Sequence, residues 1–183
     1  MPAQGHPREW PSIRPADQPG DLGWMVWAHG ELYAREYGWS TRFEALVARI
    51  VADHAQCPDP GRERAWIAEV DGRRVGCVMC VAEDHGAEDS GAGDPDGVQP
   101  PAAKLRLLLV HPSARGTGLG GRLVDTCLEF ARETGAARIA LWTNDVLGSA
   151  RRIYQARGFA LVEQERHRDF GPELVGQRWE RAL

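Results

Sequence analysis

Leu105-Arg-Leu-Leu-Leu-Val110 is followed by His111-Pro-Ser-Ala-Arg115 and then by Gly116-Thr-Gly-Leu-Gly-Gly121, and this stretch decides the fold. The first segment is typical of a buried strand, and a helix is expected to begin near Gly118. Glycines allow a ligand to approach the backbone closely, and the unpaired N–H groups at the start of a helix attract anions. The stretch therefore predicts a phosphate-binding loop between a strand and a helix.

Two better-known glycine loops fit this stretch less well. Gly116, Gly118 and Gly121 satisfy the dinucleotide pattern G-x-G-x-x-G, but five residues separate the strand from the first glycine. No Asp or Glu lies among residues 137–144 to hold a ribose, and no Lys-Ser or Lys-Thr pair follows the glycines. Nicotinamide and ATP sites are therefore disfavoured.

Elements on both sides of the loop predict a mixed sheet flanked by helices. Apolar residues at helical spacing predict helices over residues 21–37, from Thr41 onward, after Gly118 and over residues 149–157. Apolar runs predict strands at residues 10–14, 65–70, 75–82, 105–110, 137–143, 159–165 and 174–181. Asp71-Gly72 joins two of these strands as a hairpin. The strand-helix-strand unit after the hairpin predicts a right-handed crossover between parallel strands.

Composition limits the class of protein. A chain of 183 residues predicts one domain spanning residues 1–183, and the net charge of −4 provides no basic surface for nucleic acid. No apolar run is long enough to cross a membrane and residues 1–11 do not resemble a secretion signal, so we expect a cytoplasmic protein. Residues 83–101 are rich in Gly, Asp, Glu and Pro, which predicts a mobile loop.

Cysteine and histidine patterns indicate no metal site. Cys77 and Cys80 form a C-x-x-C pair, but they lie in an apolar run, where residues three apart point to opposite faces of a strand. No second pair completes a zinc site, and the six histidines lack metal-ligand spacing. We therefore predict two core cysteines and no bound metal.

Two separated motifs, Arg115-Gly-Thr-Gly-Leu-Gly120 and Ile153-Tyr-Gln-Ala-Arg-Gly-Phe159, together resemble the GNAT superfamily of CoA-dependent N-acetyltransferases. This resemblance covers roughly residues 64–168. Three further stretches look like the acetyltransferase half of bacterial proteins that join a MarR-type domain to a GNAT domain. They are Tyr33-Ala-Arg-Glu-Tyr-Gly-Trp39, Leu141-Trp-Thr-Asn144 and Phe170-Gly-Pro-Glu-Leu-Val-Gly-Gln177.

The resemblance implies an α/β (α+β) fold with acetyl-CoA as co-substrate. Its sheet would be mixed and mostly antiparallel, with six or seven strands, about four flanking helices and a central parallel pair splayed to bind CoA. The strand edge would hold the pantetheine arm, and the loop amides would hold the pyrophosphate. Thr117 is also expected to cap the following helix. The implied cofactor-binding residues are Leu108, Leu109, Val110, Arg115, Gly116, Thr117, Gly118, Leu119, Gly120, Gly121 and Asn144.

The resemblance also implies a catalytic acid. Tyr154 lies four residues before Gly158, where family members place the tyrosine that protonates the departing CoA thiolate. Lys104 and Trp142 stand where some family members carry a carboxylate base. The general base is therefore left open between a water chain and the side chains of His29, Glu31, Glu36 and His167.

The implied reaction moves an acetyl group from acetyl-CoA to an amine of a small molecule or peptide, by direct attack in a ternary complex. A catalytically silent CoA-binding sensor or interaction module is the alternative, since the family carboxylates are missing and the glycine loop is retained. Neither nucleic acid nor a membrane is expected as a partner, and a homodimer is left open. Aromatic residues in the first two helices fit either an acceptor pocket or the core: Trp24, Trp27, Tyr33, Tyr37 and Trp39.

Overall fold

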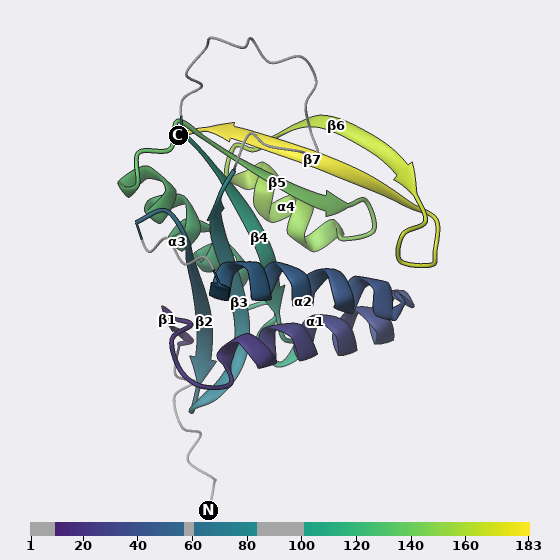
Figure 1. Cartoon of the computed structure of the whole chain (residues 1–183), viewed down its shortest axis with the longest axis horizontal. Coiled ribbons are helices and arrows are strands. Elements are labelled where there is room, and N and C mark those ends of the chain that lie inside the picture. The colour runs from purple at the N-terminus through teal and green to yellow at the C-terminus, as the bar shows by residue number, and fades with distance from the viewer. Residues whose placement is uncertain (1–9, 57–60, 84–100) are drawn as a thin grey trace, which may run out of the picture.

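The protein is built on one seven-stranded sheet (Figure 1). The computed structural model describes residues 10–56, 61–83 and 101–183, so nearly all of the loop expected over residues 83–101 lies outside the described residues. The sheet has the order β1-β2-β3-β4-β5-β7-β6, and β4–β5 is its one parallel pair. This arrangement confirms the predicted sheet. Its strands are β1 (Ser12–Pro15), β2 (Arg64–Val70), β3 (Arg73–Ala82), β4 (Ala102–Val110), β5 (Arg138–Asn144), β6 (Ala160–His167) and β7 (Leu174–Ala182).

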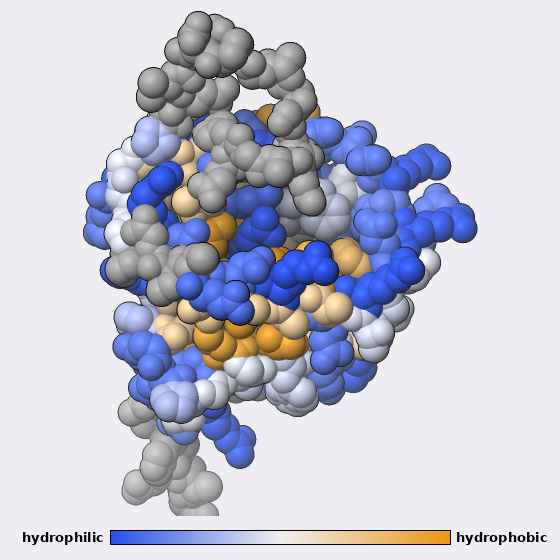
Figure 2. Space-filling model, viewed as in Figure 1, coloured by the Kyte–Doolittle hydropathy of each residue, from blue (hydrophilic) through white to orange (hydrophobic). Residues whose placement is uncertain are grey.

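Helices cover both faces of the sheet. α1 and α2 lie on one face, and α3 and α4 lie on the other (Figure 1). The solvent side of the α1–α2 layer shows apolar side chains bordered by polar ones (Figure 2). The helices in the described residues are α1 (Asp21–Tyr37), α2 (Thr41–Gln56), α3 (Leu119–Glu133) and α4 (Gly148–Ala156), with a 3-10 turn at Pro112–Ala114. None of these helices is both long enough and apolar enough to span a membrane.

Two apolar clusters hold the layers together, one on each face of the sheet. Leu123 of α3 belongs to one cluster and Met25 of α1 to the other, and both side chains are fully buried. Burial of such a side chain contributes about 1.5–3 kcal/mol. Cys80 packs in the α3 cluster and Cys77 in the α1–α2 cluster, which confirms that the C-x-x-C pair belongs to the core and points to opposite faces.

Turn residues end the elements where the sequence predicted. Asp71 and Gly72, with φ angles of 51° and 71°, connect β2 to β3. Positive φ at both central residues is the geometry of the tight hairpin turn, which favours an Asp-Gly pair. α4 ends at Ala156, and Gly158 has a φ of 75° just beyond it.

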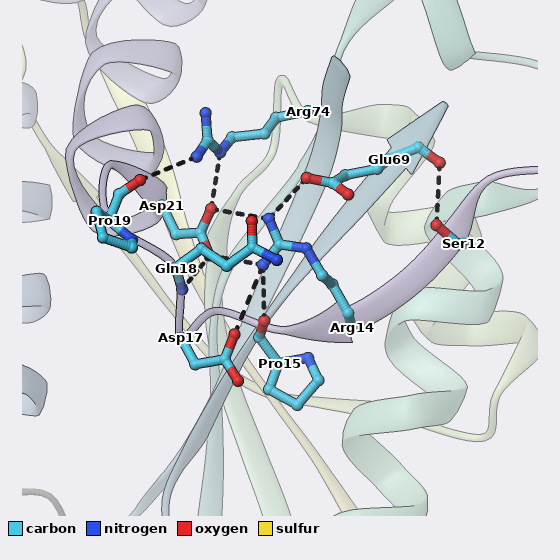
Figure 3. Close-up of polar contacts among 9 residues, drawn as sticks. All are labelled: Ser12, Arg14, Pro15, Asp17, Gln18, Pro19, Asp21, Glu69 and Arg74. Carbon is cyan, nitrogen blue, oxygen red and sulfur yellow. Dashed lines mark hydrogen bonds and ion pairs between the residues drawn. The ribbon is translucent and has the colours of Figure 1, made fainter. Parts of the chain in front are cut away.

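An ion network ties the start of α1 to the strands beside it (Figure 3). The Asp21 carboxylate is fully buried and accepts hydrogen bonds from Arg14 Nη1 at 2.6 Å and Arg74 Nε at 2.7 Å. Arg14 of β1 also pairs with Glu69 of β2 at 2.6 Å. Burial raises the pKa of Asp21, but the two arginines outweigh this effect and hold the pKa at about 2. The network therefore fixes where α1 leaves the sheet.

We expect Asp21→Asn to lower the free energy of unfolding by about 3 kcal/mol, because it removes the negative partner of buried ion pairs and leaves the arginines unpaired with it. Urea denaturation measures this change. Asp17→Asn is the matched control, since Asp17 is 72% exposed and lies 3.9 Å from Arg14. The stability contributed by the ionised Asp21 is fully present above about pH 4 and is lost as the pH falls through about 2. Equal losses of unfolding free energy in the two variants would contradict the stabilising role of the buried Asp21 carboxylate.

Candidate active site

Strands β4 and β5 are paired only along the first half of β4. Residues 102–105 of β4 pair with residues 138–141 of β5. Beyond that point β5 continues along β7 as far as Asn144, while β4 continues along β3 as far as Val110. Among the described residues, the second half of β4 therefore has no strand partner on the side that faces β5.

A bulge in β4 lies where the two strands separate. Leu107 has a φ of 53°, which a leucine seldom adopts, and it lies at an irregularity in the β3–β4 register. The Cys77 thiol of β3 donates to the Leu107 carbonyl oxygen at 3.3 Å. The bulge changes the direction of β4, and Cys77 satisfies one carbonyl that the irregular register leaves unpaired.

A groove of about 440 Å³ runs along this free edge, and we call it the β4 groove. Residues of β4, the glycine loop, α1 and α4 line it. All predicted cofactor-binding residues except Thr117 and Asn144 line it. They are Leu108, Leu109, Val110, Arg115, Gly116, Gly118, Leu119, Gly120 and Gly121.

The glycine loop presents a row of unpaired donors to the β4 groove. The backbone N–H groups of residues 116–121 donate to no acceptor among the described residues, and the Arg122 N–H is the first to bond, to Gly118 O at 3.2 Å. Gly118 has a φ of 80° and directly precedes α3. The donors and the α3 dipole together make this end of the groove a site for an anion.

Two arginines add positive charge to the β4 groove. Arg115 pairs with Glu36 of α1 at 2.9 Å, and its Nε donates to the Val110 carbonyl at 3.2 Å. Arg157 also lines the groove and forms a two-point ion pair with Asp125 of α3, at 2.6 and 2.8 Å. Sequence reasoning missed Arg157, because its neighbours in the second motif do not reveal that it packs against the glycine loop.

Two of the predicted residues take other positions. Thr117 does not cap α3, because its hydroxyl donates to Ala114 O at 2.7 Å and no side chain caps the helix. The expectation of a threonine cap was therefore wrong. Asn144 is buried, and its Oδ1 accepts from His167 Nε2 at 2.7 Å. It lines a second pocket instead of the β4 groove.

The second pocket has a volume of about 120 Å³, and residues of both β4 and β5 line it. Tyr33, Leu108, Leu147 and Ala150 line both it and the β4 groove, so the two spaces share a wall at the gap. We call it the aromatic pocket, because α1, α2, β5 and the connections between them supply His29, Tyr33, Trp39, Phe43 and Trp142.

Tyr154 lines the aromatic pocket but not the β4 groove. It projects from α4 and is 4% exposed. Burial raises the pKa of Tyr154, so its hydroxyl keeps its proton at neutral pH. A protonated phenol beside the strand gap has the chemistry of a general acid.

The four candidate bases differ in where their side chains lie. Glu31 pairs with Arg35 on the exposed side of α1, and Glu36 pairs with Arg115 at the β4 groove. His167 Nε2 donates to Asn144 Oδ1, and His167 does not line the aromatic pocket. Of the four side chains, His29 is the one that lines this pocket.

His29 is a buried, neutral histidine with one free lone pair. Its Nδ1 lies 2.8 Å from the Met25 carbonyl oxygen, so Nδ1 carries the proton and Nε2 is the acceptor. Nε2 is buried and has no partner among the described residues. Burial lowers the pKa of His29 to about 4, despite the carbonyl that raises it. The tautomer follows from tertiary packing, which the sequence does not reveal.

The chain is similar to known acetyltransferases in sequence. The model of the Acetyltransferase (GNAT) family matches residues 23–159. The human N-acetyltransferase 8B is 33% identical over 103 residues, which are 54% of this chain and 39% of that protein. An uncharacterized N-acetyltransferase of Schizosaccharomyces pombe is 32% identical over 105 residues, 56% of this chain and 63% of that protein. The chain thus spans less than two thirds of the length of these relatives.

Solved structures share the fold over nearly the whole chain. A Salmonella typhimurium protein, yncA, solved with its cofactor acetyl-CoA, matches with a TM-score of 0.70 at 18% identity, covering 96% of this chain and 95% of that one. A ribosomal-protein-alanine N-acetyltransferase from Brucella melitensis matches with a TM-score of 0.71 at 18% identity, covering 94% and 99%. At such identities these matches show the fold alone.

We expect the His29 ring to titrate with a midpoint near pH 4 when followed by NMR. Because the unfolded chain binds this proton near pH 6.5, the stability linked to His29 is fully present above about 6.5 and is lost as the pH falls toward about 4. The loss amounts to about 3 kcal/mol. His29→Gln should lack this part of the pH dependence, and a midpoint near 6.5 would contradict the burial of the neutral ring.

Proposed function

The chain belongs to the GNAT family of acetyltransferases, whose members use acetyl-CoA as co-substrate, and we propose that it acetylates an amine of a small molecule or peptide. The observation that carries this proposal is the β4 groove, where a free strand edge meets a row of unpaired loop amides. A free strand edge offers hydrogen bonds to an extended amide chain, and the amides offer hydrogen bonds to a diphosphate. Acetyl-CoA has both parts.

We propose that residues 108–110 hold the pantetheine arm and that residues 115–121 hold the pyrophosphate. The α3 dipole would add about 0.3–1 kcal/mol to binding of the anion. Arg115 and Arg157 line the same groove and carry the charge that an anionic ligand needs. Leu108 lines both spaces, so an acetyl group held along the strand edge would lie near the aromatic pocket.

The burial of the described cysteines supports direct attack by the acceptor over a route through an acetylated cysteine. Cys77, Cys80 and Cys127 are all fully buried, and burial raises the pKa values of Cys77 and Cys127. A buried thiol in an apolar core is a poor nucleophile, because the thiolate is the reactive form. The amine nitrogen would therefore attack the thioester carbon itself, forming the C–N bond as the C–S bond breaks, and would release its extra proton to a general base or to water. Tyr154 is proposed to give its proton to the departing thiolate.

The test combines acetyl-CoA binding with release of free thiol in the presence of amines, amino acids and peptides. We expect binding and thiol release with at least one acceptor class. Gly118→Ala should weaken acetyl-CoA binding about fivefold or more, since a side chain is strained at φ 80° and the added methyl points into open space at the loop. Gly135→Ala is the matched control, because Gly135 has φ 77° and equally open surroundings at the far end of α3.

These outcomes separate the candidate functions. Equal effects of the two glycine substitutions on acetyl-CoA affinity would argue against the loop as the binding site. Tight binding without thiol release for any acceptor would support the alternative, a silent CoA-binding sensor. Absence of acetyl-CoA binding would contradict both the acetyltransferase and the sensor.

Tyr154→Phe should lower kcat about a hundredfold while leaving acetyl-CoA affinity unchanged, because it removes the proton donor and keeps the ring. Steady-state kinetics on an identified acceptor measure this effect, and the melting temperature shows whether the ring still packs. Full kcat in the variant would mean that the thiolate is protonated by another group.

A further inference from the structure

Two residues that line the aromatic pocket each carry a buried polar atom that has no partner among the described residues. His29 is 2% exposed and Trp39 is 4% exposed, and both line the pocket. Neither His29 Nε2 nor Trp39 Nε1 has a hydrogen-bond partner among the described residues. Burying a polar group without a hydrogen-bond partner costs about 1–3 kcal/mol of stability. Two such groups on residues of one small pocket therefore favour binding of a ligand that supplies the missing partners.

The two atoms have opposite hydrogen-bonding character. Because His29 Nδ1–H donates to the Met25 carbonyl, Nε2 can only accept. The indole Nε1–H of Trp39 can only donate. A ligand that satisfies both must carry an N–H or O–H group and also an acceptor atom such as oxygen.

Aromatic rings fix these two atoms in place. Tyr33 stacks on the His29 ring with a centroid distance of 5.7 Å, and it lies 4.9 Å from the Trp39 ring. Phe43 contacts the Trp39 ring edge-on at 4.6 Å, and Phe170 lies 4.9 Å from it. Rings packed in this way have few alternative rotamers, so the acceptor and the donor are preorganised.

Charge on the pocket wall favours an anionic or neutral ligand group. Among the described residues that line it, Lys104 and Arg106 are cationic and none is Asp or Glu. A cationic group such as that of a polyamine would therefore find no opposite charge on these walls. The absence of a carboxylate also favours the uncharged form of an amine, which is the form that attacks a thioester.

The volume limits the part of the ligand that enters. Cavities of about 150 Å³ accept benzene, and the aromatic pocket offers about 120 Å³. The part of a ligand that enters is therefore no larger than about a benzene ring, and its polar atoms must lie close together. A long chain or a folded protein surface would have to remain outside.

Building on the proposed function, we infer that the aromatic pocket binds the acceptor as a small amine that also carries a carboxylate or carbonyl oxygen. The amine N–H donates to His29 Nε2, and Trp39 Nε1–H donates to the oxygen. An apolar amino acid has this combination of groups. The two contacts orient the nitrogen within a pocket that adjoins the β4 groove at Tyr33 and Leu108.

Three probes of one shape test the inference on the protein saturated with CoA, with dissociation constants measured by calorimetry. They are L-phenylalanine, phenethylamine, which lacks the carboxylate, and hydrocinnamate, which lacks the amine. Trp39→Phe should weaken phenylalanine and hydrocinnamate about tenfold and leave phenethylamine unchanged. His29→Asn should weaken phenylalanine and phenethylamine about tenfold and leave hydrocinnamate unchanged, because it keeps a donor for Met25 and removes the acceptor.

Matched variants show whether His29 and Trp39 bind the probes through hydrogen bonds or only shape the pocket. His29→Gln extends an amide to the place of Nε2 and should recover most of the affinity that His29→Asn loses. Trp27→Phe alters an exposed tryptophan of the same helix that lines neither space, and should change nothing. Affinity for CoA should stay the same in all four variants.

Two results would overturn the inference: phenylalanine binding no better than both partial probes in the parent protein, or each variant weakening all three probes alike. The latter pattern would mean that His29 and Trp39 only shape the pocket. Thiol release from acetyl-CoA is measured separately with the parent protein. If the probes follow the expected pattern but no thiol is released, the proposed function fails and the binding assignment stands.

Discussion

Separation of β4 from β5 after Leu105 is the constraint on which the rest of the structure depends. β5 stays with β7 and β4 stays with β3, so the sheet remains paired on both sides of the gap while β4 and β5 separate. The cost of unpaired backbone groups is tolerated only where solvent or a ligand can satisfy them. The bulge at Leu107, with its carbonyl bonded to the Cys77 thiol, gives β4 this geometry without further loss of pairing.

Residues of α1 line both the β4 groove and the aromatic pocket. His29, Tyr33 and Glu36 lie at helical spacing on one face of α1, and they reach the aromatic pocket, the shared wall and the β4 groove respectively. A small shift of α1 would therefore alter both spaces together. The Arg14–Asp21 contact at the start of the helix opposes such a shift, because it buries the charge against β1.

The two spaces have complementary chemistry. The β4 groove presents N–H donors and arginines, which suit a phosphate-bearing ligand. The aromatic pocket is lined by several rings, and those of His29 and Trp39 carry one unpartnered acceptor and one unpartnered donor among the described residues. No Asp or Glu is among the described residues that line the aromatic pocket, so an amine bound there, as proposed, would be favoured in its uncharged form. Tyr154 lines the aromatic pocket, so the proposed proton donor lies beside the proposed acceptor site.

The sequence by itself determined the elements, the hairpin at Asp71-Gly72 and the glycine loop, because helical and strand spacing, turn chemistry and backbone freedom are local properties. It also identified the nine residues of β4, the glycine loop and the start of α3 that were expected to bind the cofactor and that line the β4 groove. Tertiary structure alone decided that Thr117 bonds Ala114 instead of capping α3, and that Arg157 packs beside the loop. Only packing separated His29 from the other candidate bases, because burial, tautomer and the loss of partners arise when α1 meets the sheet, and no local pattern encodes them.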